Sequence, residues 1–237
     1  RTFLARLPDT LPDIEDAKHR KQLFVSAMLP LILRANELIV ADRGRLIAIK
    51  ERVIRSGKAG KRQRKWLETM ARRYRAPVST PVKPREIDRL LLRVDVIPPS
   101  LALAQAAMES GWGSSYFAQE GNALFGQWVW GDAEGLLPRK RDEGKTHRIR
   151  KFEYLLDSVR SYMTNLNRHN SYKGLRDRRA ELRKHSLLLT GSALAPALID
   201  YSERGVDYVG DILSIINYND LDGLDTAQLT PQTQQSR

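Results

Sequence analysis

The chain has 237 residues, with 40 lysines and arginines against 28 aspartates and glutamates, a formal net charge of +12 and no cysteine. This length suffices for a buried core without cross-links, and the lack of cysteine excludes disulfides, thiol nucleophiles and cysteine-ligated metal sites. The excess of positive charge predicts an acidic partner: nucleic acid, an anionic membrane or an anionic wall polymer.

The pattern of apolar residues, prolines and glycines divides the chain into three regions. Residues 1–84 are expected to form an N-terminal helical region that ends in a proline-rich linker starting at residue 76. Residues 85–221 have a helical pattern at both ends and a glycine- and aromatic-rich stretch between them. Residues 222–237 are polar and have no apolar period, so a disordered tail is expected there.

The N-terminal region has a helical pattern from Ile14 to Arg75, in which apolar residues recur at spacings of three, four, seven or eight. Pro30 is expected to kink or restart this helix, and Gly57 and Gly60 predict a break in it.

The sequence shows no targeting segment. Its longest apolar run, from Leu23 to Leu33, is shorter than the roughly 18 apolar residues of a spanning helix, so no transmembrane segment is expected. The chain starts without methionine, and we expect that a signal or anchor upstream of Arg1 has been removed.

The stretch from Lys58 to Arg75 is dense in lysine and arginine around Trp66, Leu67 and Met70. We interpret it as a solvated helix face from which Trp66 and Met70 pack inward. Nucleic-acid binding is the alternative, but the stretch has no recognition motif and no array of stacking aromatic residues. Nucleic acid is therefore not expected as a partner.

The strongest chemical signal lies at the end of a predicted helix. Ser100 is expected to cap its N-terminus, and Leu101–Met108 is so rich in alanine and leucine that burial nearly all round is expected. Glu109 follows at the C-terminal end, before Gly111, which can supply a left-handed cap. The negative end of the helix dipole and apolar surroundings both raise the pKa of a carboxyl group. A buried Glu109 would thus suit general acid catalysis; an ordinary exposed glutamate at a fraying helix end is the alternative.

The residues after Glu109 favour the first interpretation. Three of the four tryptophans of the chain fall within Trp112–Trp130, interleaved with glycines. Aromatic faces stack on sugar rings, and glycines let the backbone approach a ligand. The alternative for Trp112 and Phe125 is a small hydrophobic core under a loop.

The run ALAQAAMESGWGSSYFAQEGNALFGQW resembles the core motif of the bacterial glucosaminidases of glycoside hydrolase family 73, and more closely that of the Bax-type group within this family. The shared features are a helix that ends in Glu-Ser-Gly-Trp-Gly and a following Asn-x-Leu-Phe-Gly. Weaker likeness in KQLFVSAMLPLILRANELIV, FEYLLDSVRSYMTNLNRH and YSERGVDYVGDILSIINYN extends the resemblance over about residues 18–220.

This resemblance implies a mainly α (α+β) fold, lysozyme-like, with a small β-hairpin lobe over a groove. It also implies an endo-β-N-acetylglucosaminidase that cuts the glycan of peptidoglycan by general acid catalysis. No cofactor is expected, and we expect a monomer in the bacterial cell envelope, in the periplasm.

The resemblance also assigns roles to residues. Glu109 matches the catalytic acid, and a second carboxylate lies in the variable β-lobe, for which we choose Glu143 because it precedes the alternating segment from Thr146 to Phe152. The other carboxylates before the helix that starts near Leu155 are Asp132, Glu134, Asp142 and Glu153. The acetamido oxygen of the substrate can also serve, which would make Glu143 secondary.

A tyrosine near the acid is part of the same family pattern. Tyr201 matches the tyrosine that opens the family run Tyr-Ala-Thr-Asp-Pro-x-Tyr, which reads YSERGVDY here, is one residue longer and lacks the proline. Whether Tyr201 or Tyr208 approaches the acid is left open. Tyr162 shares a helix face with apolar residues, so core packing is its alternative role. The residues expected to bind substrate are Asn122, Phe125, Gly126, Trp128, Tyr162, Asn165, Tyr172 and Tyr208.

Other kinds of site have little support. The histidines have no ligand-spaced partners, so no metal site is expected, and Ser110 has no histidine and aspartate relay. Nucleotide-binding glycine motifs are absent. Two alternatives to the hydrolase stay open: a non-catalytic module that binds an anionic polymer, nucleic acid or wall, through Lys58–Arg75, and a lytic transglycosylase on the same fold.

Overall fold

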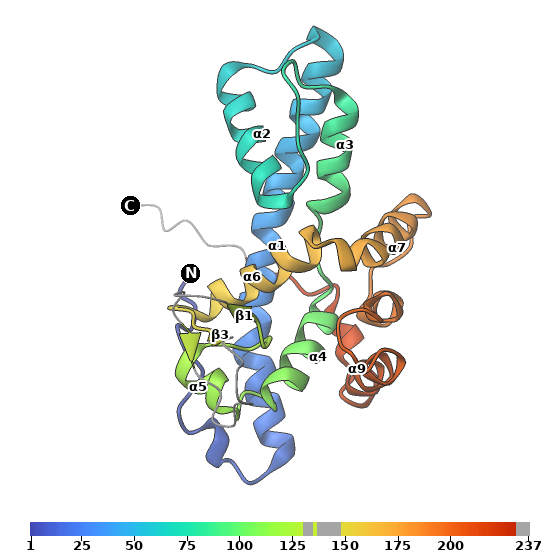
Figure 1. Ribbon diagram of the computed structural model, residues 1–237. Helices are drawn as coiled ribbons and strands as arrows, with labels where there is room; N and C mark the ends of the chain where they lie inside the picture. Colours follow the sequence, from blue (N-terminus) through green and yellow to red (C-terminus); the bar gives the residue numbers. More distant parts are fainter. Residues whose placement is uncertain (130–134, 137–147, 231–237) are drawn as a thin grey trace.

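The computed structural model describes residues 1–129, 135–136 and 148–230, which form a mainly helical protein with a small sheet (Figure 1). This confirms the predicted fold class. The longer helices are α1 (Ala17–Ser56), α2 (Lys61–Tyr74), α3 (Pro84–Arg93), α4 (Pro99–Ser110), α6 (Leu155–Arg168), α7 (Lys173–Lys184) and α9 (Val206–Tyr218). The short ones are η1 (Leu11–Asp13), α5 (Tyr116–Gly121), η2 (Asn170–Tyr172), α8 (Gly191–Leu194), η3 (Ala195–Leu198) and η4 (Leu221–Leu224).

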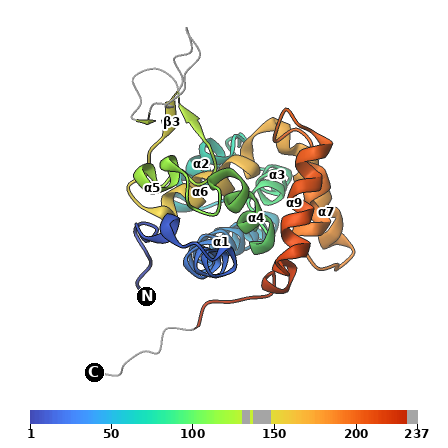
Figure 2. The same ribbon diagram turned by 90° about the horizontal axis from the view of Figure 1, so that it is seen from below.

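The sheet has three short antiparallel strands, β1 (Trp128–Val129), β2 (Gly135–Leu136) and β3 (Arg148–Arg150). Strand β3 lies between the other two; Ile149 pairs with Trp128 on one side and with Leu136 on the other. The expected hairpin lobe is therefore a three-stranded sheet in the described part of the chain, and it follows α5 on the side of the molecule away from α9 (Figure 2).

Helix α1 runs along most of the length of the molecule and packs against α3, α4 and α6 (Figure 1). It continues through Pro30, so the expected restart does not occur, because buried residues before and after the proline pack in the core. It ends at Gly57, whose φ of 71° is left-handed, which confirms the predicted break. By length and composition α1 could cross a membrane; core helices meet the same criterion, and α1 supplies buried side chains from Phe24 to Val53.

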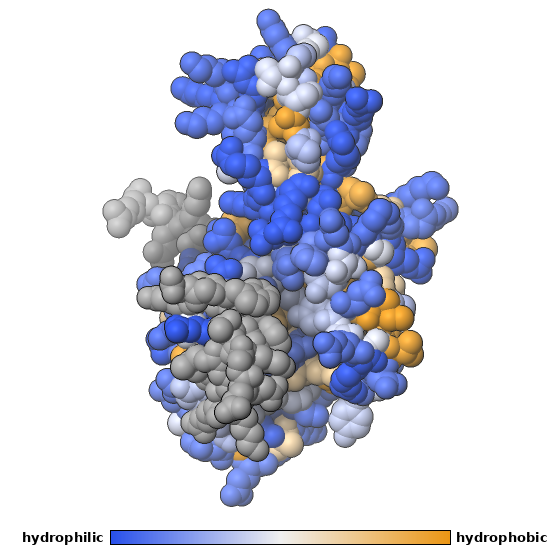
Figure 3. Space-filling model, viewed as in Figure 1, coloured by the Kyte–Doolittle hydropathy of each residue, from blue (hydrophilic) through white to orange (hydrophobic). Residues whose placement is uncertain are grey.

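Helices α2 and α3 pack beside the second half of α1 (Figure 1). Met70 is buried, and Trp66 packs against the core with the Arg45 guanidinium 4.2 Å from its ring centre. The lysines and arginines of α2 point to solvent, and this edge is strongly hydrophilic (Figure 3). The structure thus agrees with a solvated basic face.

The hydrophobic core is continuous across the expected boundary at residues 84 and 85. It joins Leu46 of α1, Leu67 of α2, Leu90 of α3, Leu101 of α4 and Tyr162 of α6. The predicted linker lies between α2 and α3, and α3 begins at Pro84, where the fixed φ of proline suits a first helical position. The N-terminal helices therefore share one core with the rest of the chain.

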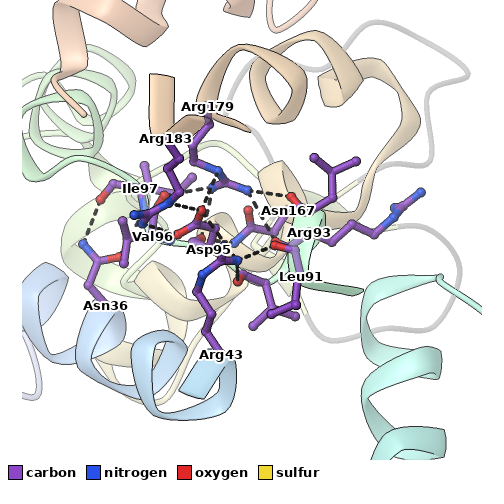
Figure 4. A network of polar contacts seen from close by, with 12 residues as sticks. Asn36, Arg43, Leu91, Arg93, Asp95, Val96, Ile97, Asn167, Arg179 and Arg183 are labelled. Atoms are coloured by element: carbon purple, nitrogen blue, oxygen red, sulfur yellow. Dashed lines mark hydrogen bonds and ion pairs between the residues drawn. The ribbon is translucent and has the colours of Figure 1, made fainter. Parts of the chain in front are cut away.

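The segment that leads into α4 is held by a cluster of buried polar groups around Asp95 (Figure 4). Arg183 of α7 donates two hydrogen bonds to the Asp95 carboxylate, at 2.5 and 2.6 Å. The Asp95 carbonyl oxygen accepts from Asn167 of α6 and from Arg179, which is 1% exposed. Arg43 of α1 adds a 3.7 Å ion pair. Three helices thus fix the start of α4.

The first turn of α4 differs from the prediction. The N-cap is Pro98, and Ser100 is the second residue of the helix, because two prolines fit the helix start without donating hydrogen bonds. The Ser100 hydroxyl instead donates to Asp225 at 2.7 Å and lies 3.1 Å from Asp222. The Asp225 carboxylate also accepts the N–H groups of Ser100 and Gly191.

These contacts also bear on the tail that was expected to be disordered from residue 222. Residues 222–230 are part of the described structure, and disorder from residue 222 is wrong for them, because Asp222 and Asp225 satisfy N–H groups at the first turns of α4 and α8. Further along, Arg1 donates to the carbonyl oxygen of Thr230. Residues 231–237 lie outside the described residues.

Candidate active site

Glu109 lies in the last turn of α4, whose remaining residues are almost all buried. Gly111 follows with a φ of 57°, which is the predicted left-handed cap. The side chain of Glu109 is exposed to solvent, so the expectation of a buried acid is wrong. The physical reason is the helical phase, since Ser110 takes the buried position at this turn and Glu109 points outward.

The protein nonetheless controls the protonation of Glu109. Desolvation by the surrounding protein raises the pKa of its carboxyl group, and a hydrogen bond from Tyr208 opposes this rise only in part. The direction favours the protonated acid, as the sequence predicts, although the group remains accessible.

A chain of three hydrogen bonds leads from the core to Glu109. The Tyr162 hydroxyl donates to Gln105 Oε1 at 2.5 Å, Gln105 Nε2 donates to the Tyr208 hydroxyl at 2.9 Å, and Tyr208 donates to Glu109 Oε1 at 3.2 Å. The first three side chains are buried, with 2% exposure or less. Burial raises the pKa of Tyr162 and of Tyr208, and the charge of Glu109 raises both further, so both hydroxyls remain protonated donors.

The donor and acceptor in each of these three hydrogen bonds follow from the chemistry of the side chains. Because Tyr162 donates to the amide oxygen of Gln105, the amide nitrogen must face Tyr208. The Tyr208 oxygen then accepts from Gln105, and its own O–H points to Glu109 Oε1. The relay, defined as Tyr162, Gln105 and Tyr208, therefore presents a donor to one oxygen of the acid.

Aromatic rings from several elements surround the relay. Phe125, between α5 and β1, stacks on Tyr162 with ring centres 3.9 Å apart and an interplanar angle of 6°. Tyr201 stacks on Tyr208 at 5.3 Å, and Tyr172 of η2 lies 5.7 Å from Tyr201. The structure thus brings five predicted aromatic site residues together beside Glu109. Of the two tyrosines left open by the sequence, Tyr208 makes the hydrogen bond to Glu109, and Tyr201 packs against its ring.

Gly126 lies next to the second oxygen of the acid. It has a φ of 57°, and a Cβ atom on it would lie 3.6 Å from Glu109 Oε2. This position therefore borders the oxygen that the relay leaves free.

The other predicted site residues lie away from the relay or outside the described residues. Asn122 is buried at the C-cap of α5 and donates to the carbonyl oxygens of Phe152 and Glu153, so it holds this loop. Asn165 is half-buried on α6, one turn after Tyr162. The backbone of Trp128 lies in β1 and pairs with Ile149. Glu143, like Asp132, Glu134 and Asp142, lies outside the described residues, whereas Glu153 is exposed.

Gln105 was not among the residues expected at the site. A signal for it exists, because Gln105 is the single polar residue within the apolar run of Leu101–Met108 and lies four positions before Glu109, on the same helix face. A buried amide in such a helix needs partners. Those partners come from α6 and α9, which no local pattern reveals.

Residues 86–221 match the family model of the glucosaminidases, described as mannosyl-glycoprotein endo-beta-N-acetylglucosaminidase. The chain is 34% identical over 202 residues to "Protein bax" of Escherichia coli (strain K12), a match that covers 84% of this chain and 70% of that protein. No solved structure matches.

Proposed function

The chain belongs to the glucosaminidase family, a family of glycosidases, and from this premise we propose that it is a peptidoglycan hydrolase. The proposed activity is that of an endo-β-N-acetylglucosaminidase with Glu109 as general acid. The observation that carries the proposal is the hydrogen bond from Tyr208 to Glu109 Oε1 at the end of the relay.

The relay determines which oxygen of Glu109 delivers the proton. Since Oε1 accepts the Tyr208 hydrogen bond, the acidic proton of the neutral carboxyl group is on Oε2. This oxygen lies beside Gly126, on a residue that is exposed to solvent. A glycosidic oxygen that approaches along Gly126 takes this proton while positive charge develops on the sugar ring.

The raised pKa of Glu109 supports this role, since a general acid must keep its proton until the substrate is bound. The stacked tyrosines hold the Tyr208 hydroxyl in place. Glu143 is the proposed second carboxylate, which activates water or stabilises charge, with the acetamido oxygen of the substrate as an alternative for the same step.

Peptidoglycan is the proposed substrate because it is an acidic glycan. It carries muramyl and peptide carboxylates, and the chain has a net charge of +12. The proposed location is the bacterial cell envelope, in the periplasm, where this polymer is found.

The test compares the native chain with Glu109→Gln on purified peptidoglycan. We expect release of reducing ends to fall by about 10²- to 10⁴-fold, the usual contribution of a general acid, with an unchanged circular dichroism spectrum. Undiminished release in the variant would refute the role of Glu109. Mass spectrometry of the products separates the alternatives, because a lytic transglycosylase leaves anhydro ends and a hydrolase leaves reducing ends.

A further inference from the structure

A cavity lies at the opposite end of α9 from Tyr208. It has a volume of about 1110 Å³ and lies between the first turns of α1, Trp112 and the end of α9 with the segment after it. The residues that line it include Lys18, Lys21, Trp112, Tyr218, Asn219 and Asp220. Tyr208 and Tyr218 are ten positions apart on one helix, or about 15 Å. The residues that line the cavity include neither Glu109 nor a member of the relay.

The ammonium group of Lys21 lies between two aromatic rings in this cavity. Its Nζ atom is 4.9 Å from the ring centre of Trp112 and 5.2 Å from that of Tyr218. Tyr218 is 84% exposed, an unusual position for a large ring. Trp112 is half-buried and packs edge-on against Phe24, which holds its ring in place.

The cavity also has unpaired positive charge. Within the described part of the chain no carboxylate forms an ion pair with Lys18 or Lys21, whereas Lys50, Lys173 and Lys184 each pair with a carboxylate. The Lys21 ammonium group is positioned by two rings, is half-buried and has no ion-pair partner among the described residues, so it is suited to an anionic ligand.

The Tyr218 ring and the Lys21 ammonium group together indicate the chemistry of the ligand. An exposed tyrosine ring offers a flat apolar face on which a sugar ring can stack, and an adjacent ammonium group favours a carboxylate on that sugar or close to it. A polyphosphate fits less well, because Asp220 lines the same cavity and the negative end of the α9 dipole lies beside it.

We propose that this cavity is a second, non-catalytic binding site for a carboxylate-bearing glycan, with Tyr218 stacking on a sugar ring and Lys21 pairing with the carboxylate. The proposal rests on the proposed function, in that an acidic glycan is also the substrate proposed for Glu109. The site would hold a strand of the polymer while another part of it is cut.

The test uses the Glu109→Gln chain, which allows binding without turnover, and follows the indole N–H signal of Trp112 by NMR. Four probes are added: a disaccharide of N-acetylglucosamine and N-acetylmuramic acid, the same disaccharide with its stem peptide, the neutral chitotetraose and a single-stranded oligonucleotide. We expect the two acidic saccharides to shift the signal and chitotetraose to leave it unchanged. A response to both acidic saccharides assigns the bound carboxylate to muramic acid, and a response only to the second assigns it to the peptide.

Variants test the two contacts. Lys21→Met and Tyr218→Ala should each weaken the affinity reported by the Trp112 signal by about tenfold, as expected for loss of a charge-assisted contact or a stacked ring. Tyr218→Phe, which keeps the ring, and Lys184→Met, a distant exposed lysine, should leave it unchanged.

The proposal is overturned if no acidic saccharide shifts the Trp112 signal, or if only the oligonucleotide does. Its failure is distinguishable from that of the proposed function. Loss of the Trp112 response with normal release of reducing ends by the native chain removes only the second site. A Trp112 response in a chain that releases no reducing ends removes only the catalytic proposal.

Discussion

Replacement of Tyr208 by phenylalanine removes the one hydrogen bond that the described structure donates to the Glu109 carboxylate and leaves the ring in place. This bond stabilises the ionised form of Glu109 and so lowers its pKa, against a rise from desolvation. Without the bond, desolvation acts alone, and the pKa of Glu109 should rise further.

The size of the shift follows from the geometry. A hydrogen bond to a charged group contributes about 1.5–3 kcal/mol, equivalent to about one to two pKa units. The Tyr208 bond is long for a hydroxyl and a carboxylate, at 3.2 Å, and Glu109 is exposed, so water replaces part of the loss. We therefore expect a rise of about one pKa unit, at the lower end of that range.

The assay is the pH dependence of kcat/KM on a soluble peptidoglycan fragment. A general acid is active in its protonated form, so activity falls as pH rises through the pKa of Glu109 in the free enzyme. In Tyr208→Phe this basic limb should move to higher pH by about one unit, while the maximum rate falls because Glu109 is less well positioned. Tyr201→Phe is the matched control, since Tyr201 stacks on Tyr208 and makes no hydrogen bond to Glu109.

A basic limb that stays in place, or moves to lower pH, in Tyr208→Phe would refute this account of the relay. An equal shift in Tyr201→Phe would indicate a general change of the site. The variant also leaves Gln105 Nε2 without its acceptor, which should reduce the free energy of unfolding by about 1–3 kcal/mol. Urea unfolding measures this loss separately from the pH profile.

Two further predictions concern access to the acid and the support of α4. In Gly126→Ala the new Cβ lies at ordinary contact distance from Glu109 Oε2, whereas the larger, branched side chain of Gly126→Val should cover this oxygen. A φ of 57° strains both variants, and valine more because it is β-branched, so circular dichroism must show that both are folded. The valine variant should therefore release reducing ends at least about tenfold more slowly than the alanine variant, and equal rates would contradict the assigned approach. Asp95→Asn should lower the free energy of unfolding by about 3 kcal/mol, because it leaves buried Arg179 without a carboxylate. The control is the exposed ion pair of Asp177, where Asp177→Asn should lower the free energy of unfolding by under about 1 kcal/mol. Urea unfolding measures both variants, and equal losses would show that the Asp95 cluster is not a stabilising feature.

Local features of the sequence predicted the elements that local physics determines. The apolar spacing placed the helices on both sides of Gly57, and the alanine-rich run before Gly111 predicted both a buried helix and its left-handed cap. The basic face of α2 was also predicted, because it needs no partner other than solvent. The family resemblance, in turn, supplied the expectation for Glu109.

Long-range contacts account for what the sequence did not reveal. Gln105 is 57 residues from Tyr162 and 103 from Tyr208, so the relay exists only after α4, α6 and α9 have packed together. The tail was expected to be disordered because its composition is polar, yet Asp225 is fixed by N–H groups of α4 and α8 that are distant in sequence. A capping partner of this kind leaves no periodic pattern.

The exposure of Glu109 follows from the kind of substrate that a glycan hydrolase must reach. A polymer cannot enter a closed core, so its acid must present an oxygen to solvent, and desolvation alone then provides limited control over its pKa. The relay supplies the remaining control from the buried side, since Oε1 is held by Tyr208 and Oε2 is left free beside Gly126. The start of α4 must be fixed for this to work, and the Asp95 cluster before the helix and Asp225 at its first turn do so. In the proposed mechanism, buried polar groups remote from Glu109 thus contribute to catalysis through the position of one helix.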